Sequence, residues 1–244
     1  METMSSYNPH IFKSINYLLD SDRLFHTNNG PAVRSGSMRD LFIKHGVVDG
    51  LGLILLHKHF EIGEDQALVD YNGTAMAWDL KGTAVSENGV VQKHGGFIKP
   101  RAWLLSTNKK QLIPYEFYFQ HYKTTENIAY NQTALPRLTE EFVNEFAEIL
   151  QRDNLTSVLG VCLLKSPLKT EVETSEGCAN ISVSVTDDAI FDSSSSIEAI
   201  WNYKVEKPNG DSPGVGFGSK FRCNYICLDI TNGHIVGHLP PINS

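Results

Sequence analysis

The pattern of apolar and polar residues along the chain predicts three helices. Each is expected to begin at a residue that caps a helix N-terminus and to carry apolar residues at the spacing of one helical face. The predicted starts are Asn8, Ser37 and Thr139. The second and third helices are expected to end at Gly46 and near Asn154, because both residue types tolerate the left-handed conformation that often terminates a helix.

Most of the remaining chain has the alternation, or the β-branched and aromatic composition, that is typical of strands. A buried run is predicted at 51–60, and further strands at 67–71, 96–106, 112–119, 157–164, 180–185, 199–205 and 220–230. Asn72-Gly73 has the composition of a tight hairpin turn. Because such strands are joined by hairpins rather than by helices, the sequence predicts a strand-rich α+β fold with a mainly antiparallel sheet.

Two segments of the chain resemble each other. Leu51-Gly-Leu-Ile-Leu-Leu-His57 matches Leu159-Gly-Val-Cys-Leu-Leu-Lys165, and each follows a predicted helix with a left-handed end. This match predicts two duplicated halves, each a helix followed by a meander, with the second a degenerate repeat packed on the first. The halves would be residues 1–135 and 136–244. The alternative is that any helix leading into a buried strand gives this pattern.

Composition narrows the class of partner. The net charge of −7 disfavours a nucleic-acid partner, which normally requires a basic surface. No apolar run approaches the length of about 18 residues that spans a membrane, so no membrane partner is expected. The first ten residues lack the basic and apolar regions of a secretory signal, which favours a cytoplasmic location. The expected partner is a small-molecule substrate, and the sequence does not indicate an oligomeric state.

The strongest chemical signal is a pair of histidines at the end of the most apolar run. In an extended chain, residues two apart point the same way, so His57 and His59 would present two imidazoles to one metal ion. Glu64 follows closely enough to return beside them from the next turn. Two histidines and a carboxylate suit iron, zinc, manganese, nickel or copper and leave coordination positions for substrate. The alternative is that the histidines are the solvated margin of a buried strand.

The segment from Gly52 to Gly73, with His57, His59 and Glu64, resembles the first motif of the cupin superfamily. That resemblance implies a metal site, although both glycines are displaced from the family's pattern. The second motif is not found intact, and His94 is the histidine at a suitable distance to act as a fourth ligand. The His-Lys-His-Phe stretch is also similar to one in uncharacterised proteins of filamentous fungi, a similarity that implies no activity.

Two further groups are candidates for chemistry. Glu116 alternates with aromatic residues in a predicted strand, so it could enter a pocket as a catalytic acid or base, or else face solvent. The other group has the residue types of a structural zinc site: Cys223, Cys227, His234 and His238. The short segment between its cysteines and histidines indicates a hairpin rather than a zinc finger. We therefore expect core cysteines and edge histidines there.

These observations predict a metal-dependent enzyme acting on a small organic substrate, of oxygenase, isomerase or hydrolase type. A competing hypothesis is a non-catalytic ligand-binding or protein-interaction module, in which the histidines would be splayed or solvated. A third hypothesis is a metal-free enzyme with His57 or His59 as general base. The first of the three requires the two histidines to converge on one point.

Overall fold

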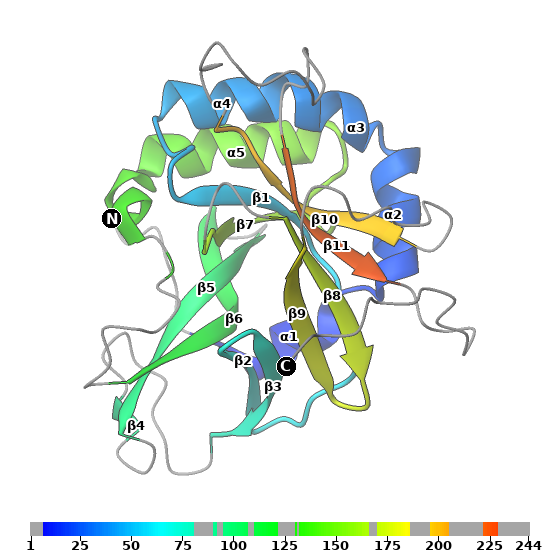
Figure 1. The fold of residues 1–244 in the computed structure, drawn as a ribbon. Coiled ribbons are helices and arrows are strands. Elements are labelled where there is room, and N and C mark those ends of the chain that lie inside the picture. Colours follow the sequence, from blue (N-terminus) through cyan, green and yellow to red (C-terminus); the bar gives the residue numbers. More distant parts are fainter. Residues whose placement is uncertain are drawn as a thin grey trace, which may run out of the picture.

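The two most apolar runs of the chain pair with each other in the sheet. Leu51–Leu55 (β1) and Leu159–Leu163 (β7) are antiparallel and buried throughout. A computed structural model describes residues 7–80, 90–91, 95–106, 110–121, 130, 132–165, 170–185, 196–204 and 222–228. In Figure 1, β1 and β7 lie beneath the helices that cover one side of a large, curved sheet.

The helices are short, and α5 is the longest of them. They are α1 (Pro9–Ser14), α2 (Leu18–Thr27), α3 (Gly30–Val33), α4 (Arg39–Lys44) and α5 (Glu140–Arg152). A π-helical turn (Arg34–Met38) joins α3 to α4, and a 3-10 turn (Gln132–Arg137) precedes α5. The remaining strands are β2 (Gln66–Tyr71), β3 (Thr74–Asp79), β4 (Val90–Val91), β5 (Gly96–Ser106), β6 (Gln111–His121), β8 (Thr170–Glu176), β9 (Ala179–Val185), β10 (Ser196–Asn202) and β11 (Arg222–Leu228).

The described strands form one sheet that closes on itself. Its order is β4-β5-β6-β2-β3-β9-β8-β11-β10-β1-β7, and β5 also pairs with β7, so that every strand except β4 belongs to a closed barrel. Two pairs, β2–β6 and β8–β11, are parallel, and the others are antiparallel. The prediction of a strand-rich α+β fold with a mainly antiparallel sheet is confirmed. The closure into a barrel was not predicted.

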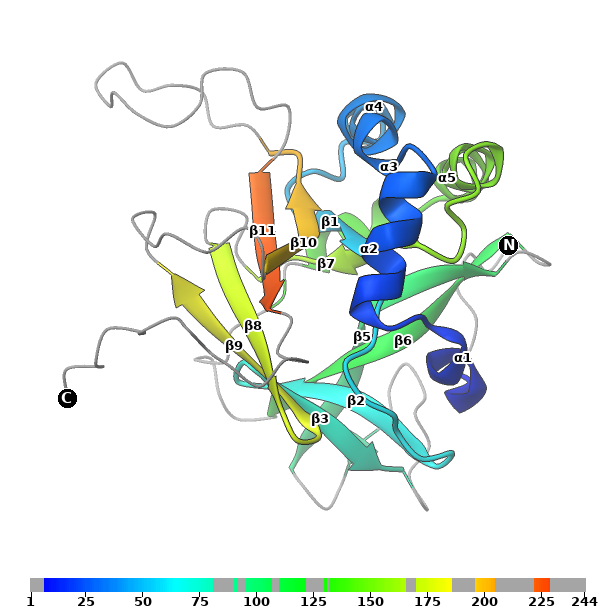
Figure 2. The same cartoon turned by 90° about the vertical axis from the view of Figure 1, so that its right-hand side faces the viewer.

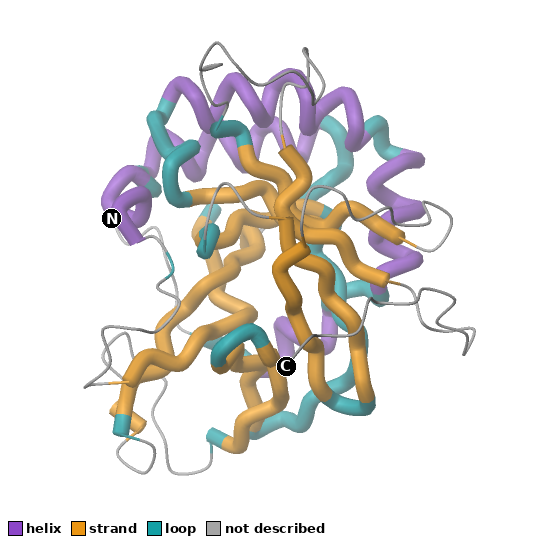
Figure 3. Tube along the Cα trace, in the orientation of Figure 1, coloured by secondary structure: helices purple, strands orange, loops and turns teal. Residues whose placement is uncertain are grey.

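Aromatic side chains pack the helices against one another and against the outside of the barrel. Phe42 of α4 packs edge-on against Phe142 of α5, with ring centres 5.8 Å apart. Phe25 of α2 stacks on Trp201 of β10 at 5.1 Å. Burying side chains of this size is among the largest favourable contributions to folding. In Figure 3 most of the helices lie along the top and right edge of the molecule, and strands form most of the part below them.

Strand register shows which side chains face the inside of the barrel. Val69 pairs with Phe117, and both belong to a small apolar cluster packed against Tyr7. Tyr7 lies two residues before the start of α1, which lies outside the barrel (Figure 2). The neighbouring pair, Leu68 and Glu116, therefore faces the interior, because successive residues of a strand point to opposite sides.

The same inner face continues around the barrel through paired residues. Asp70 pairs with Ala75, Ala75 with Asn180, and Asn180 with Ser175. Paired residues share a face, so all four belong to the interior. Glu173 lies two residues before Ser175 on β8 and points the same way. The interior consequently carries charged side chains from several strands of the barrel.

The structure corrects two predicted helices. The single helix predicted to begin at Asn8 is two helices, α1 and α2, with a break between them where the Asn16 carbonyl accepts a hydrogen bond from the Lys58 backbone. The second predicted start, Ser37, lies inside a helical run that begins at Gly30. The predicted Asn8 and Thr139 caps are confirmed, since both side chains accept backbone hydrogen bonds.

Strand β8 was missed, and its composition explains why. Thr-Glu-Val-Glu-Thr-Ser-Glu is rich in glutamate, which is depleted in ordinary strands. Here Glu171 and Glu173 point into a polar barrel interior. The inward-facing residues of this strand are therefore polar, the reverse of the usual pattern. The prediction of edge histidines at His234 and His238 lies outside the described residues.

Candidate metal centre

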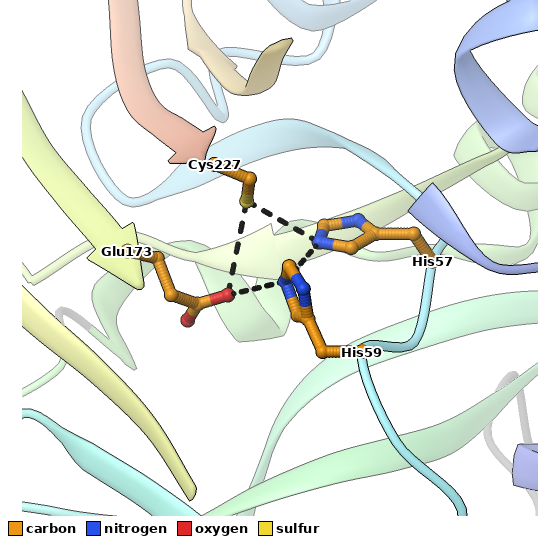
Figure 4. A group of neighbouring side chains, drawn as sticks. All are labelled: His57, His59, Glu173 and Cys227. Atoms are coloured by element: carbon orange, nitrogen blue, oxygen red, sulfur yellow. Dashed lines mark hydrogen bonds and ion pairs between the residues drawn. The ribbon is translucent and has the colours of Figure 1, made fainter. Parts of the chain in front are cut away.

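Four side chains with metal-binding atoms converge inside the barrel. His57, His59, Glu173 and Cys227, here called the metal cluster, each offer one donor atom, and these atoms all lie within 4.8 Å of one another. Figure 4 shows the side chains pointing toward a common centre from three separate segments of the chain. The His59 and Glu173 side chains are 8% and 9% exposed, and Cys227 is 1% exposed. The cluster is thus largely withdrawn from solvent.

The chain just after β1 positions the two histidines. The Lys58 backbone bridges to Tyr17 and donates to the Asn16 carbonyl, which holds this segment extended beyond the end of the strand. Lys58 itself turns away, and its ammonium donates to the Lys13 carbonyl and pairs with Glu61. The alternation predicted from the sequence therefore places both imidazoles on the same side.

Neighbouring strands supply the other two ligand candidates. Glu173 on β8 is the register partner of Cys227 on β11 in a parallel pair. Paired residues of adjacent strands point to the same face of the sheet, which brings the carboxylate and the thiol together. The Cys227 sulfur lies 3.7 Å from Glu173 Oε1 and 3.3 Å from His57 Nε2.

Four of the six separations between donor atoms are close to those of a tetrahedral site. His57 Nε2 and His59 Nε2 are 3.1 Å apart, and His59 Nε2 is 3.0 Å from Glu173 Oε1. Metal–ligand bonds of about 2.0–2.3 Å, arranged tetrahedrally, separate neighbouring donors by about 3.3–3.8 Å. The four neighbouring separations of 3.0–3.7 Å are within a few tenths of an ångström of this range, and the two remaining donor pairs lie within 4.8 Å.

Hydrogen bonding and burial prepare His57 for ligation. Its Nδ1 lies 2.8 Å from the Leu55 carbonyl oxygen, a contact in which Nδ1–H donates and Nε2 keeps its lone pair for the cluster. Burial, reinforced by the neighbouring charge of His59, lowers the pKa of His57 to about 4. The ring is therefore neutral at physiological pH, the form that binds a metal.

Glu173 is held in its charged form. Burial alone would raise the pKa of this carboxyl, but the hydrogen bond and charge of His59 outweigh burial and lower the pKa to about 2. A carboxylate anion is thus present at neutral pH inside the barrel. It is the group that most favours a cation at this position.

A second set of buried polar side chains lies inside the same barrel, and we call it the Arg101 network. Its members are Asp70, Arg101, Glu116, Tyr130 and Lys165. Asp70 Oδ2 accepts from three of them, Arg101 Nη1 at 3.1 Å, Lys165 Nζ at 2.8 Å and the Tyr130 hydroxyl. Arg101 Nε donates to Glu116 at 2.9 Å.

The structure distributes the sequence-predicted site residues over different places. It brings His57 and His59 together in the metal cluster. Glu64 is not in this cluster: it lies on the surface with its side chain 71% exposed and pairs with Lys13 at 3.0 Å, because the turn carries it outward. Glu116 is buried and bound to Arg101 rather than facing solvent. His94 lies outside the described residues.

The sequence interpretation missed Glu173 and Cys227 as partners of the histidines. Cys227 was assigned to the core, and it is indeed buried, but against His57 and Glu173. Two weak signals were available in the glutamate alternation of β8 and in a cysteine within an apolar strand. Neither identifies its partner, because register between distant strands is a property of the closed sheet.

A second group with metal-binding side chains lies at the surface, and it already has a cation. His45, Glu141 and Glu145 lie close together between α4 and α5. The ammonium of Lys44 contacts Glu145 at 2.5 Å and Glu141 at 3.4 Å. These carboxylates are therefore neutralised by a side chain, and the metal cluster in the barrel is the stronger candidate.

Comparison of this chain with protein-family models, with curated proteins and with solved structures gave no match. None of the described helices combines the length and the apolar character needed to cross a membrane. The chemistry of the residues inside the barrel is therefore the evidence for a function.

Proposed function

We propose that this protein is a metal-dependent enzyme that acts on a small organic substrate inside its barrel. The observation that carries the proposal is the convergence of His57, His59, Glu173 and Cys227 on one buried point. Burying a carboxylate and three further polar groups is costly unless a cation or a hydrogen-bond network compensates for the loss of water. A metal ion held by these four residues would supply that compensation.

The donor set favours zinc. Two imidazoles, one thiolate and one carboxylate combine the nitrogen, sulfur and oxygen ligands that Zn²⁺ accepts in tetrahedral sites. Bound zinc acts as a Lewis acid toward a carbonyl or lowers the pKa of a water molecule. Among the reaction types expected from the sequence, this donor set supports hydrolase or isomerase chemistry over oxygen activation.

The barrel supports a catalytic role over a purely structural one. Barrels of about eight strands are just wide enough to be filled by side chains, and this barrel is larger. Its interior carries the Arg101 network in addition to the metal cluster. Buried ion pairs contribute little net stability, so a second charged group in the same interior is better explained by a function.

The experiment that tests the proposal is elemental analysis of protein purified without chelators. The wild type should carry close to one equivalent of zinc or another divalent transition metal. The folded double variant His57→Ala/His59→Ala should carry almost none, and a surface variant, His10→Ala, should match the wild type. A wild type that stays metal-free after reconstitution would refute the proposal.

One observation favours a second candidate, a metal-free enzyme with a cysteine nucleophile. The Cys227 sulfur lies 3.3 Å from His57 Nε2, within reach of a general base whose Nδ1 is held by Leu55. This candidate predicts activity that survives chelators and is lost on Cys227→Ala. The binding-module hypothesis is less favoured, because the histidines converge in a buried site.

We also infer that the two halves of the barrel arose by duplication. The matching residues Leu53 and Val161 are register partners, as symmetry between the halves requires. The closing hydrogen bonds also correspond, since Leu164 N donates to Gly50 O as Leu56 N donates to Val158 O. The parallel pairs β2–β6 and β8–β11 occupy equivalent places in the strand order.

Under that correspondence the metal cluster exists in one copy. Lys165 occupies the place of His57, and the register pair Asp70 and Tyr118 occupies the place of Glu173 and Cys227. The Arg101 network thus lies where a second metal cluster would be. The halves would then have diverged into one site that binds a metal cation and one site in which the ammonium of Lys165 takes the place of that cation.

A further inference from the structure

Two irregularities in the barrel wall aim polar side chains at the interior. The register of β5 and β6 shifts on either side of the pair Ala102 and Glu116, which leaves Arg101 and Tyr115 without register partners. Such bulges add a residue to one strand and redirect side chains, and they are frequent next to active sites.

Alternation on both sides shows where these residues point. Phe117 and Pro100 form an outward-facing pair, whereas Glu116 and Ala102 form an inward-facing one. Tyr115 is fully buried, and the inward-facing Glu116 and Cys162, the latter the register partner of Ala102, lie close enough to act on its phenol. The bulges therefore place Arg101 and Tyr115 beside the inward pair.

Each of these two residues keeps a donor without a partner among the described residues. Arg101 uses Nε toward Glu116 and Nη1 toward Asp70 and Tyr130, and its Nη2 donates to none of them. The Tyr115 hydroxyl is buried and also has no hydrogen-bond partner there. Buried donors normally find partners, so the unpartnered Tyr115 hydroxyl, together with a guanidinium edge that no described residue uses, indicates a ligand or water site.

Both donors lie within electrostatic reach of the metal cluster. The charge of Arg101 contributes to lowering the pKa of His57 and of Glu173. Glu173 and Arg101 in turn act on the phenol of Tyr115, whose pKa is raised by burial, so that the hydroxyl keeps its proton. A guanidinium edge and a phenol proton are strong donors to a carboxylate.

We infer that Arg101 Nη2 and the Tyr115 hydroxyl bind a carboxylate of the substrate beside the metal. The substrate would be a small organic acid whose carboxylate contacts these donors while a second oxygen reaches the metal. This inference rests on the proposed function, and it specifies the substrate class of that same site. Asp70, Glu116 and Tyr130 act as positioning residues, because they fix the guanidinium and leave one edge available.

The test is calorimetric titration of zinc-loaded and metal-free protein with malonate and with its uncharged diamide. Malonate should bind the zinc-loaded wild type, and malonamide should bind about tenfold more weakly or less. Tyr115→Phe removes only a hydroxyl that has no partner, so the variant should fold with unchanged zinc content. Loss of one hydrogen bond to a charged group should weaken malonate binding about tenfold or more.

Arg101→Lys should weaken malonate binding similarly, and Tyr71→Phe, a change on the barrel exterior, should leave it unchanged. If the zinc content is normal, two results would overturn the inference. One is a wild type that does not bind malonate, and the other is a Tyr115→Phe variant that binds malonate as tightly as the wild type. Protein that binds no zinc would refute the proposed function instead. Tyr115-dependent malonate binding to that metal-free protein would still support the carboxylate site.

Discussion

Glu173 and Glu64 are two glutamates whose places in the fold do not follow from their distance to the histidines in the sequence. Glu64 lies near the histidines in sequence, but its carboxylate pairs with Lys13 at the surface. Glu173 is distant in sequence, and strand pairing brings it within 3.0 Å of His59. Proximity along the chain thus identified the two histidines but selected the wrong partner for them.

This contrast provides a matched pair of variants. Glu173→Gln keeps the shape of the side chain but removes the charge that a cation requires. We expect metal affinity to fall at least roughly 100-fold, because losing a direct ligand should cost no less than losing an outer partner of a ligand. Glu64→Gln should have no measurable effect. Competition with a chromogenic chelator measures both affinities, and equal values in the two variants would remove Glu173 from the ligand set.

Asp70 predicts a specific pH dependence. Burial raises its pKa, but the charges of Arg101 and Lys165 outweigh burial and lower the pKa to about 2, from an ordinary value of 3.8. A lowered pKa stabilises the folded state fully above about pH 5, and this contribution is lost as the pH falls from about 4 toward 2.

The stability lost with Asp70→Asn should therefore shrink at low pH, by about 2 kcal/mol between pH 5 and pH 2. Urea denaturation of variant and wild type across that range measures the difference. Asp20→Asn, which changes an exposed carboxylate, serves as the control and should show no such trend. A constant difference for Asp70→Asn would contradict the ion pairing described here.

At the scale of elements, the sequence located helix ends better than helix starts. Gly46 and Asn154 were predicted as left-handed ends, and their φ angles are 62° and 55°. These positions follow from the residue alone, because few residues adopt that conformation without strain. The start at Gly30 was missed, since it depends on Asn29 adopting a left-handed conformation that its sequence context did not indicate.

The left-handed helix ends predict that two substitutions differ in their effect on the free energy of unfolding. Gly46→Ala introduces a side chain where φ is positive and should lower the free energy of unfolding by about 1 kcal/mol. Asn154→Gly relieves a comparable constraint and should leave stability unchanged or slightly higher. Urea unfolding of both variants measures these changes, and equal destabilisation by the two would contradict the assigned conformations.

At the scale of the whole molecule, the closure of the barrel could not be predicted from the sequence. Most strands were predicted individually, because local alternation and turn residues define them. Which strand lies beside which depends on contacts between distant segments, such as β1 between β10 and β7. The ligands on β8 and β11 could not be paired with the histidines for the same reason, since their meeting point exists only once the sheet closes.

Closure predicts that the first half does not fold alone. Residues 1–135 contain β1, β3 and β5, each of which has neighbours in the second half: β10 and β7, β9, and β7. Without them, apolar strand faces and unpaired backbone groups would be exposed. Circular dichroism and urea unfolding should show no cooperative transition for this fragment. Cooperative unfolding of residues 1–135 alone would contradict this dependence.

X-ray absorption at the zinc edge tests the central claim most directly, because it reports the atoms around the metal whatever the substrate. Zinc-loaded protein should show one sulfur at about 2.3 Å and nitrogen or oxygen ligands at about 2.0–2.1 Å. The sulfur contribution should disappear in Cys227→Ser. A spectrum with no sulfur in the wild type, or with sulfur that survives this substitution, would contradict the assignment of the metal cluster.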